Sequence, residues 1–174
     1  ESNLAYSRDE APVEIAKRCK ALHFTPHDTA AGLEMAMAAK SAGAVTASDI
    51  DNLVDGIEGL LPYIDILVAS SEFPEKLTGI ADKRQALIKI HDKYGCAVTG
   101  VTLGEQGSML YCGGEFIETP GFAVPGGCKD TTGAGDSYRV GLLYGLLTGR
   151  SVEESARAAN AVAALKCRAV GART

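Results

Sequence analysis

Short apolar runs alternate with helix-like segments through the first half of the chain, and this alternation restricts the fold more than any other feature. Four apolar runs have the length of buried strands, at residues 21–24, 43–47, 63–69 and 96–103. Helical spacing or capping residues mark other segments, at residues 13–20, 28–42, 53–60, 70–79 and 81–94. A strand–helix rhythm of this kind is typical of a mostly parallel sheet with helices on both faces. The sequence therefore predicts an α/β fold.

A β-hairpin is predicted in the second half of the chain. Residues 109–112 and 115–118 are strand-like, and the two glycines between them are typical of a tight hairpin turn. Ligands of parallel α/β sheets gather at the carboxyl ends of the strands. Acids and small residues follow predicted strands or begin helices at Asp28, Asp49, Glu72, 102–104 and the loop before Asp136. We expect a binding site where these positions converge.

Composition and charge limit what the protein binds. The 174 residues are 46% hydrophobic and 22% charged with a net charge of −5, which fits one globular domain and argues against nucleic-acid or membrane partners. No apolar run approaches the ~20 residues of a membrane span. The five cysteines contain no C-x-x-C pair, so neither a zinc site nor a disulfide framework is indicated, and a reducing, cytoplasmic location is expected. Cys128 is interpreted as a small packing residue, with a reactive thiol as the alternative.

A loop of small residues followed by an acid carries the strongest chemical signal. Residues 129–136 read Lys-Asp-Thr-Thr-Gly-Ala-Gly-Asp, and an apolar run follows. Because Gly133, Ala134 and Gly135 have almost no side chain, their N–H groups can approach a ligand, and a helix beginning near Asp136 makes them an anion site. A carboxylate beside an anion makes chemical sense if it takes a proton from a hydroxyl during phosphoryl transfer. A helix cap is the alternative role of Asp136.

Residues 130–137 resemble the second signature of the ribokinase-like, or phosphofructokinase B-type, carbohydrate kinases, D-T-x-G-A-G-D-[ST]. The resemblance implies that Asp136 is the catalytic base. It also implies that the amides of Gly133, Ala134 and Gly135 form an anion hole for the γ-phosphate. Val140 stands where that family commonly has glycine, so we expect altered packing in the first turn of the helix and less change in its chemistry.

Two further stretches resemble parts of the family that contact the nucleotide. A turn similar to the family's T-L-G-x-x-G pattern implies that Thr102, Gly104 and Gly107 line the phosphates or ribose of ATP. Residues 158–165 are similar to the alanine-rich helix on the adenine side, which implies a polar contact from Asn160. Tight packing against a neighbouring helix is the alternative reason for those alanines.

The resemblance also implies cation sites. Residues 75–79 are similar to the family's E-x-L-T-G segment, near which an acid helps to place Mg²⁺. Glu72 is the candidate for that acid, and a solvated acid at a helix N-terminus is the alternative. Asp130 and Thr132 match positions that hold a monovalent cation in some relatives, so K⁺ is an additional expected cofactor.

Together these features predict an ATP- and Mg²⁺-dependent sugar kinase that transfers the γ-phosphate to a carbohydrate hydroxyl. A small-molecule sugar or sugar-like substrate is the expected partner, and a homodimer is the oligomer considered. A nucleoside kinase of the same fold and a non-catalytic nucleotide-binding module are the alternatives. Residues 121–128 lack the Lys-Ser/Thr of a Walker loop, and no strand is followed by the glycine pattern of a dinucleotide-binding fold.

The whole chain, residues 1–174, is interpreted as the nucleotide-binding and catalytic portion of a ribokinase-like kinase. Members of that family carry an earlier glycine signature, most sugar contacts and a small β-sheet lid before this portion, and none of these is visible here. The chain also begins at Glu1 rather than at Met. We therefore expect a fragment or a processed product, with poor catalysis by this segment alone.

Overall fold

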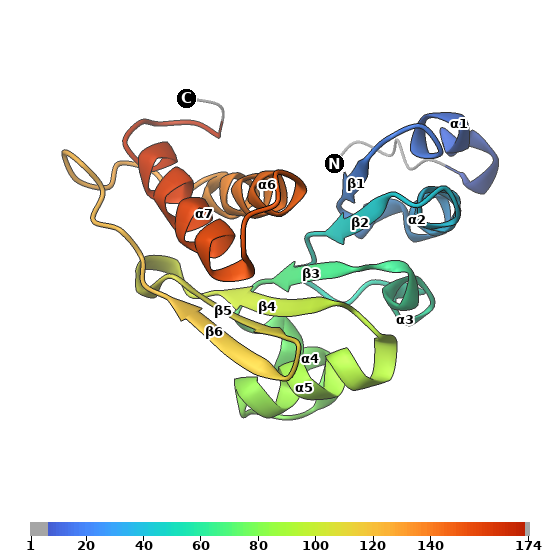
Figure 1. Ribbon diagram of the computed structural model, residues 1–174, viewed down its shortest axis with the longest axis horizontal. Coiled ribbons are helices and arrows are strands. Elements are labelled where there is room, and N and C mark those ends of the chain that lie inside the picture. The colour runs from blue at the N-terminus through green and yellow to red at the C-terminus, as the bar shows by residue number, and fades with distance from the viewer. Residues whose placement is uncertain (1–6, 173–174) are drawn as a thin grey trace. The chain divides into compact units, whose positions relative to one another are not determined.

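The computed structural model describes residues 7–172, which contain a sheet of six strands flanked by helices (Figure 1). The hydrogen-bonded order of the strands, β1-β2-β3-β4-β5-β6, equals their order in the chain. The chain divides into two compact units, residues 1–99 and 100–174, and β4 (Val98–Thr102) contributes residues to both. This architecture confirms the predicted α/β class with a mostly parallel sheet.

The first unit contains the parallel strands. They are β1 (Ala21–Phe24), β2 (Val45–Ser48), β3 (Ile66–Ala69) and the beginning of β4. The helices are α1 (Val13–Ala16), α2 (Thr29–Ser41), α3 (Ile57–Leu60), α4 (Phe73–Thr78) and α5 (Lys83–Tyr94), with 3-10 turns at Arg8–Glu10, Pro26–Asp28 and Leu61–Tyr63. Parallel pairing places Ala21 opposite Val45 and Ala47 opposite Ile66. Because parallel strands need a crossover connection, α2 lies between β1 and β2 in the chain.

The core of the first unit is built on β3, whose four residues are all buried. Leu67 of this strand packs in one apolar cluster with Phe73 and Ile90. Helix α5 also buries Leu87 and Tyr94, which lie three and four residues from Ile90 and so share its face of the helix. Burial of each large apolar side chain contributes roughly 1.5–3 kcal/mol to stability, so this face holds α5 against the sheet.

Three helices of the first unit are markedly shorter than predicted, and the one expected over 13–20 ends at Ala16. The helix expected over 70–79 begins at Phe73, because Pro74 lacks an N–H and is tolerated only in the first turn of a helix. The helix expected over 53–60 has only four residues. Gly56 precedes it with a φ of 79°, a left-handed backbone conformation that interrupts a right-handed helix.

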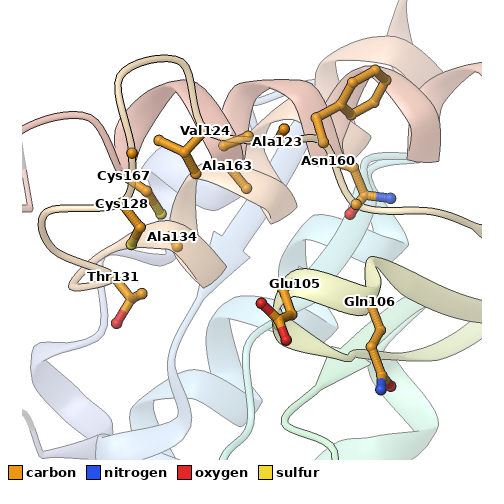
Figure 2. Close-up of a pocket in the computed structure, with 15 residues that line it drawn as sticks. Glu105, Gln106, Ala123, Val124, Cys128, Thr131, Ala134, Asn160, Ala163 and Cys167 are labelled. Carbon is orange, nitrogen blue, oxygen red and sulfur yellow. The ribbon is translucent and has the colours of Figure 1, made fainter.

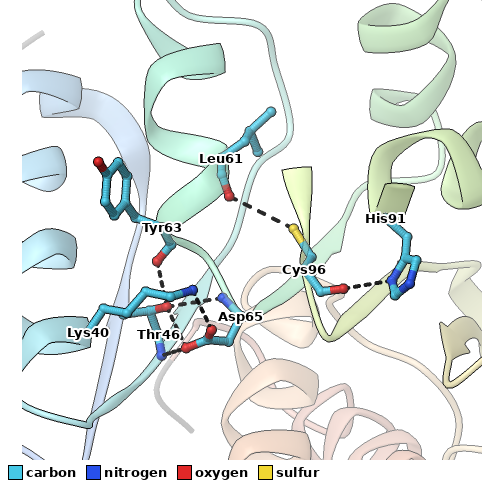
Figure 3. A network of polar contacts seen from close by, with 7 residues as sticks. All are labelled: Lys40, Thr46, Leu61, Tyr63, Asp65, His91 and Cys96. Carbon is cyan, nitrogen blue, oxygen red and sulfur yellow. Dashed lines mark hydrogen bonds and ion pairs between the residues drawn. The ribbon is translucent and has the colours of Figure 1, made fainter. Parts of the chain in front are cut away.

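A polar network joins β2 to the residues before β3 (Figure 3). Lys40 Nζ lies 2.7 Å from Asp65 Oδ1. Asp65 Oδ2 accepts a hydrogen bond from the Thr46 N–H at 2.9 Å and lies 2.9 Å from the Thr46 hydroxyl. That hydroxyl lies 2.6 Å from the Tyr63 carbonyl oxygen and accepts from the Asp65 N–H at 3.0 Å. Burial raises the pKa of Asp65, but the bonds from Lys40 and Thr46 outweigh it and hold the pKa below its ordinary value.

Asp65→Asn is expected to lower the free energy of unfolding by about 1–3 kcal/mol at pH 7, because hydrogen bonds to a charged group are lost. A lowered folded-state pKa means that the stabilisation is present above the unfolded pKa of about 3.9 and is lost as the pH falls through the folded value. Urea unfolding at pH 7 and pH 3 measures both effects. Asp92→Asn, on an exposed position of α5, is the control. An equal loss at both pH values would contradict the assignment.

The second unit consists of a hairpin and a pair of helices (Figure 1). Strands β5 (Ser108–Cys112) and β6 (Glu115–Thr119) pair antiparallel. Gly113 and Gly114 join them with φ of 60° and 86°, which confirms the predicted hairpin turn. A 3-10 turn at Gly104–Gln106 precedes the hairpin, and helices α6 (Ala134–Leu147) and α7 (Val152–Lys166) follow it. No helix in residues 7–172 is both long and apolar enough to cross a bilayer.

Helices α6 and α7 approach each other closely at two glycines. A Cβ on Gly141 would lie 3.0 Å from Ala159 Cα, and a Cβ on Gly145 would lie 2.5 Å from Ser155 Oγ. Val140 is 59% exposed. Val140 thus lies mostly in solvent while the glycine face of α6 contacts α7, and altered packing of the first turn stays a prediction.

Candidate active site

The loop before α6 positions the start of that helix. Gly133 is the N-cap residue with a φ of 79°, and a Cβ there would lie 3.0 Å from the Cβ of Ala172. Glycine is needed at Gly133 for both reasons, because side chains oppose a positive φ and no space remains for one. The helix begins at Ala134, two residues before the predicted start, since Gly133 already makes the turn into it.

Three backbone N–H groups at this helix end have no acceptor among residues 7–172. The Ala134 N–H donates to the Thr131 carbonyl oxygen at 3.0 Å. Within the described part of the chain, no hydrogen bond is made by the N–H groups of Gly133, Gly135 and Asp136, as expected for the start of a helix. These groups carry the partial positive charge of the helix N-terminus and form a site suited to an anion.

The Asp136 side chain is available for chemistry at the same place. It is exposed, and among the residues that the structure describes its carboxylate makes no hydrogen bond or ion pair. Arg139, one turn later, is buried, and its Nη1 lies 2.6 Å from the position of a Cβ on Gly135. A free acid, free amides and a guanidinium therefore share the first two turns of α6, and sequence reasoning singled out all of these but Arg139.

Asp130 holds the loop to the C-terminal turn. Its Oδ1 accepts from the Thr132 N–H at 2.9 Å, and its Oδ2 accepts from the Gly171 N–H at 2.8 Å. These bonds, that of Gly171 first, lower the pKa of Asp130 to about 2. The buried Lys166 ammonium donates to the Asp130 carbonyl oxygen at 3.0 Å. Asp130 and Thr132 therefore stabilise the loop that leads into the N-terminus of α6.

A pocket of about 900 Å³ adjoins this loop (Figure 2). Its walls come from the turn before β5, the loop after β6, residues 129–136 (the signature loop) and one face of α7. The lining residues are Gly104, Glu105, Gln106, Gly121, Phe122, Ala123, Val124, Gly127, Cys128, Thr131, Ala134, Asn160, Ala163, Ala164 and Cys167. Most are small or apolar, and the volume lies in the range of small-molecule and cofactor sites.

Only two of the four residues predicted for nucleotide contact from the turn at 102–107 and from α7 line the pocket. Gly104 and Asn160 line the pocket. Gly107 lies behind it, with a φ of 100° and a hypothetical Cβ only 2.0 Å from the Thr119 carbonyl oxygen. Thr102 ends β4 and is half-buried outside the lining. Of the turn at 102–107, Gly104 therefore lines the pocket. Gly107, its second glycine, packs against the backbone of Thr119 and Gly121 instead.

Asn160 belongs to a buried hydrogen-bond network. Its Nδ2 donates to the Thr119 hydroxyl at 2.8 Å, to the Thr119 carbonyl oxygen at 3.2 Å and to the Ser108 hydroxyl at 3.2 Å. The Tyr138 hydroxyl donates to Ser108 Oγ at 2.8 Å, and burial raises the pKa of Tyr138 to about 12. These bonds join α6 and α7 to the hairpin. The Asn160 amide nitrogen is thus occupied, and contact with a nucleotide base stays a prediction.

Several lining residues were not among the predicted site residues. Glu105 and Gln106 lie in the turn whose glycines were singled out, and 122–124 follow the hairpin in a stretch that was considered only as a Walker loop. Cys128 and Cys167 lie at one end of the pocket. The signal that could have found 122–124 is position, because a loop between a hairpin strand and the signature loop must pass the α6 N-terminus.

Glu72 lies in the first unit, where it is the N-cap residue of α4. Its side chain is 75% exposed and forms an ion pair with Lys76 at 3.1 Å. Across residues 7–172, no group of three or more His, Cys, Asp or Glu side chains is placed to hold a metal ion. Mg²⁺ in nucleotide sites is commonly held by one or two carboxylates together with phosphate oxygens and water. A single acid such as Glu72 or Asp136 is compatible with that kind of site, which needs no cluster of protein ligands.

The structure is that of an α/β protein with unbonded N–H groups at a helix N-terminus beside a cofactor-sized pocket. The chain is 33% identical over 146 residues to the ribokinase of Arabidopsis thaliana, covering 80% of this chain and 38% of that protein. Its structure is similar to that of adenosine kinase from Sinorhizobium meliloti, with a TM-score of 0.86 and 26% identity. The structure of Arabidopsis thaliana ribokinase complexed with ribose and ATP gives 0.80 and 29%.

The pattern of the pfkB family carbohydrate kinases matches residues 3–174, and the chain belongs to this family. The two solved structures cover 97% of this chain, while the chain covers 55% of each of them. The chain thus spans about half the length of these structures and a smaller share of the Arabidopsis ribokinase sequence. The ribokinase-like fold predicted from the signature loop is confirmed.

Proposed function

We propose that this chain carries the nucleotide-binding and catalytic portion of a kinase that transfers the γ-phosphate of ATP to a sugar hydroxyl. The observation that carries the proposal is the end of α6, where the free N–H groups of Gly135 and Asp136 adjoin the exposed Asp136 carboxylate. Thr131 and Ala134 of the same loop line the pocket, which places a cofactor-sized space next to the reacting groups. Membership of the pfkB family supports the reaction class.

In the proposed mechanism, Asp136 accepts the proton of the acceptor hydroxyl as that oxygen attacks the γ-phosphorus. The N–H groups of Gly135 and Asp136 stabilise the charge on the transferring phosphoryl group. The Gly133 N–H also makes no hydrogen bond to a described residue and joins them, whereas the Ala134 N–H is bonded to the Thr131 carbonyl oxygen and only shapes the turn. The Arg139 guanidinium adds positive charge near Gly135.

The nucleotide is assigned to the pocket of the second unit. Ala163 and Ala164 on α7 leave room for a flat base, and Gly104 brings backbone to the pocket without a side chain. Thr102 and Gly107 support the turn that carries Gly104. Asn160 holds α7 to the hairpin through its amide nitrogen, and its carbonyl oxygen is the atom we assign to a polar contact with the base.

Cations complete the proposal. Mg²⁺ bound with the nucleotide would neutralise phosphate charge, and Glu72 is retained as an acid that would help to place it. A monovalent cation at the loop of Asp130 and Thr132 stays a prediction, because both carboxylate oxygens of Asp130 already accept backbone hydrogen bonds. A reducing, cytoplasmic location is also proposed, supported by five free cysteines.

A nucleoside acceptor is the second candidate. The similarity to the adenosine kinase structure, which has the higher TM-score of the two structures compared, favours it. The proposed groups at α6 act in the same way on any alcohol, so the acceptor does not change the mechanism. A non-catalytic nucleotide-binding module is the remaining alternative, which predicts ATP binding without turnover.

A phosphate-acceptor screen with ATP and Mg²⁺ tests the proposal, run on the complete gene product beside the 174-residue chain. Sugars and nucleosides are offered separately, and ADP release is measured with and without K⁺. Turnover with a sugar supports the proposal, and turnover with nucleosides alone supports the second candidate. Binding of ATP by the complete product without turnover supports the module. Absence of ATP binding, measured by calorimetry on the same samples, would contradict all three.

A further inference from the structure

Two cysteines meet at one end of the pocket. Cys128, in the loop after β6, is exposed, and Cys167, the C-cap of α7, is buried. Figure 2 shows their sulfur atoms close together in the pocket wall. Burial raises the pKa of Cys167, and the neighbouring Cys128 thiol raises it further. Two free thiols 39 positions apart in the chain thus lie close together at one end of the pocket.

The backbone around the pair holds this contact in place. The Lys129 N–H donates to the Cys167 carbonyl oxygen at 2.9 Å, which fastens the residue after Cys128 to the end of α7. Gly126 and Gly127, with φ of 80° and 82°, precede Cys128 and have open space where a Cβ would be. The loop can therefore adjust toward the geometry that a disulfide needs, while the carbonyl contact limits how far the thiols separate.

We propose that Cys128 and Cys167 form a peroxide-reactive dithiol, a modification site in the pocket wall that closes to a disulfide. Cys128 attacks hydrogen peroxide as the exposed thiol and becomes a sulfenic acid, with release of one water. The Cys167 sulfur then attacks the Cys128 sulfur, the S–OH bond breaks, and the thiol proton leaves with hydroxide as a second water. Two electrons pass from the thiols to the peroxide, and a dithiol reductant reverses the change.

The site is linked to the nucleotide, and this link rests on the proposed function. Both cysteines line the same pocket as Ala163, Ala164 and Gly104. A nucleotide there covers Cys128, and a disulfide holds the loop so that the pocket cannot adapt to the nucleotide. Coupling between two sites is reciprocal. If the nucleotide protects the two thiols from oxidation, then oxidation of the thiols must lower the affinity for the nucleotide.

The test uses the reduced 174-residue chain treated with hydrogen peroxide. Free thiols, counted with a chromogenic disulfide under denaturing conditions, are expected to fall from the five in the sequence to three. Peptide mapping without reductant is expected to find a peptide pair joined through Cys128 and Cys167. ATP at about ten times its dissociation constant is expected to slow the reaction about tenfold.

Matched variants identify the pair. Cys128→Ser and Cys167→Ser each remove the cross-link, while Cys112→Ser on the hairpin retains it. Cys96 is not a competing partner, because it lies in the apolar cluster of the first unit and does not line the pocket. Peptides in which Cys128 is oxidised beyond the sulfenic state, or is joined to another cysteine, would overturn the proposal. A Cys128–Cys167 cross-link with no effect of ATP would uphold the dithiol and count against the nucleotide assignment instead.

Discussion

Asp136→Asn is expected to lower turnover of the complete gene product by about 10²–10⁴, the usual contribution of a general base. Asparagine has nearly the same size and keeps an acceptor oxygen, but it cannot take the proton of the acceptor hydroxyl. Because the free N–H groups of Gly135 and Asp136 are backbone atoms, they persist in the variant. ATP affinity is therefore expected to change little. Steady-state ADP release measures the first effect, and calorimetric titration with ATP measures the second.

The control for this variant is Glu153→Gln. Glu153 is an exposed acid in the first turn of α7, as Asp136 is in the first turn of α6. Loss of either charge at a helix N-terminus costs about 0.3–1 kcal/mol of stability, so the two variants should be destabilised alike while only Asp136→Asn loses turnover. Near-normal turnover of Asp136→Asn would remove this carboxylate from the mechanism and leave it only as a negative charge in the first turn of α6.

Gly107→Ala is expected to lower the free energy of unfolding by about 3–5 kcal/mol, because a strained backbone and a steric clash add at one position. The φ of 100° at Gly107 disfavours any side chain, and the new Cβ would lie 2.0 Å from the Thr119 carbonyl oxygen and 2.5 Å from the Gly121 nitrogen. Both neighbours are backbone and cannot rotate away. Since the turn carries Gly104 to the pocket, ATP affinity should also fall. Urea unfolding and ATP titration measure the two effects.

Gly113→Ala separates the two causes. Gly113 also has a positive φ, of 60°, but no atom lies within 4 Å of its hypothetical Cβ. Its loss of stability should be only about 1–2 kcal/mol, the cost of a left-handed conformation for alanine. Equal losses in the two variants would show that the backbone conformation alone matters, and unchanged stability of Gly107→Ala would contradict the packing at Gly107.

The elements were predicted well where their cause is local. Gly79 and Gly95 end α4 and α5 in the left-handed conformation, and the Gly113–Gly114 turn joins the hairpin. Each of these depends on the freedom of glycine within one turn, which the neighbouring residues suffice to show. The start of α6 was misplaced by two residues. The turn residue Gly133 is also held by Ala172, a distant contact that the local pattern does not contain.

The order of strands and helices, the helix ends at glycine and the glycine-rich turn before α6 could all be predicted from local patterns, because periodicity and turn chemistry act over a few residues. The pocket could not be read in this way. Its walls combine the turn at Gly104, the loop at Phe122 and the helix at Ala163, and only the packing of these segments places them together. The same holds for Asn160, whose hydrogen-bond partners lie 41 and 52 residues away. The hydrogen bonds that a side chain can offer a ligand depend on which of its donors and acceptors are already bonded to residues distant in the sequence.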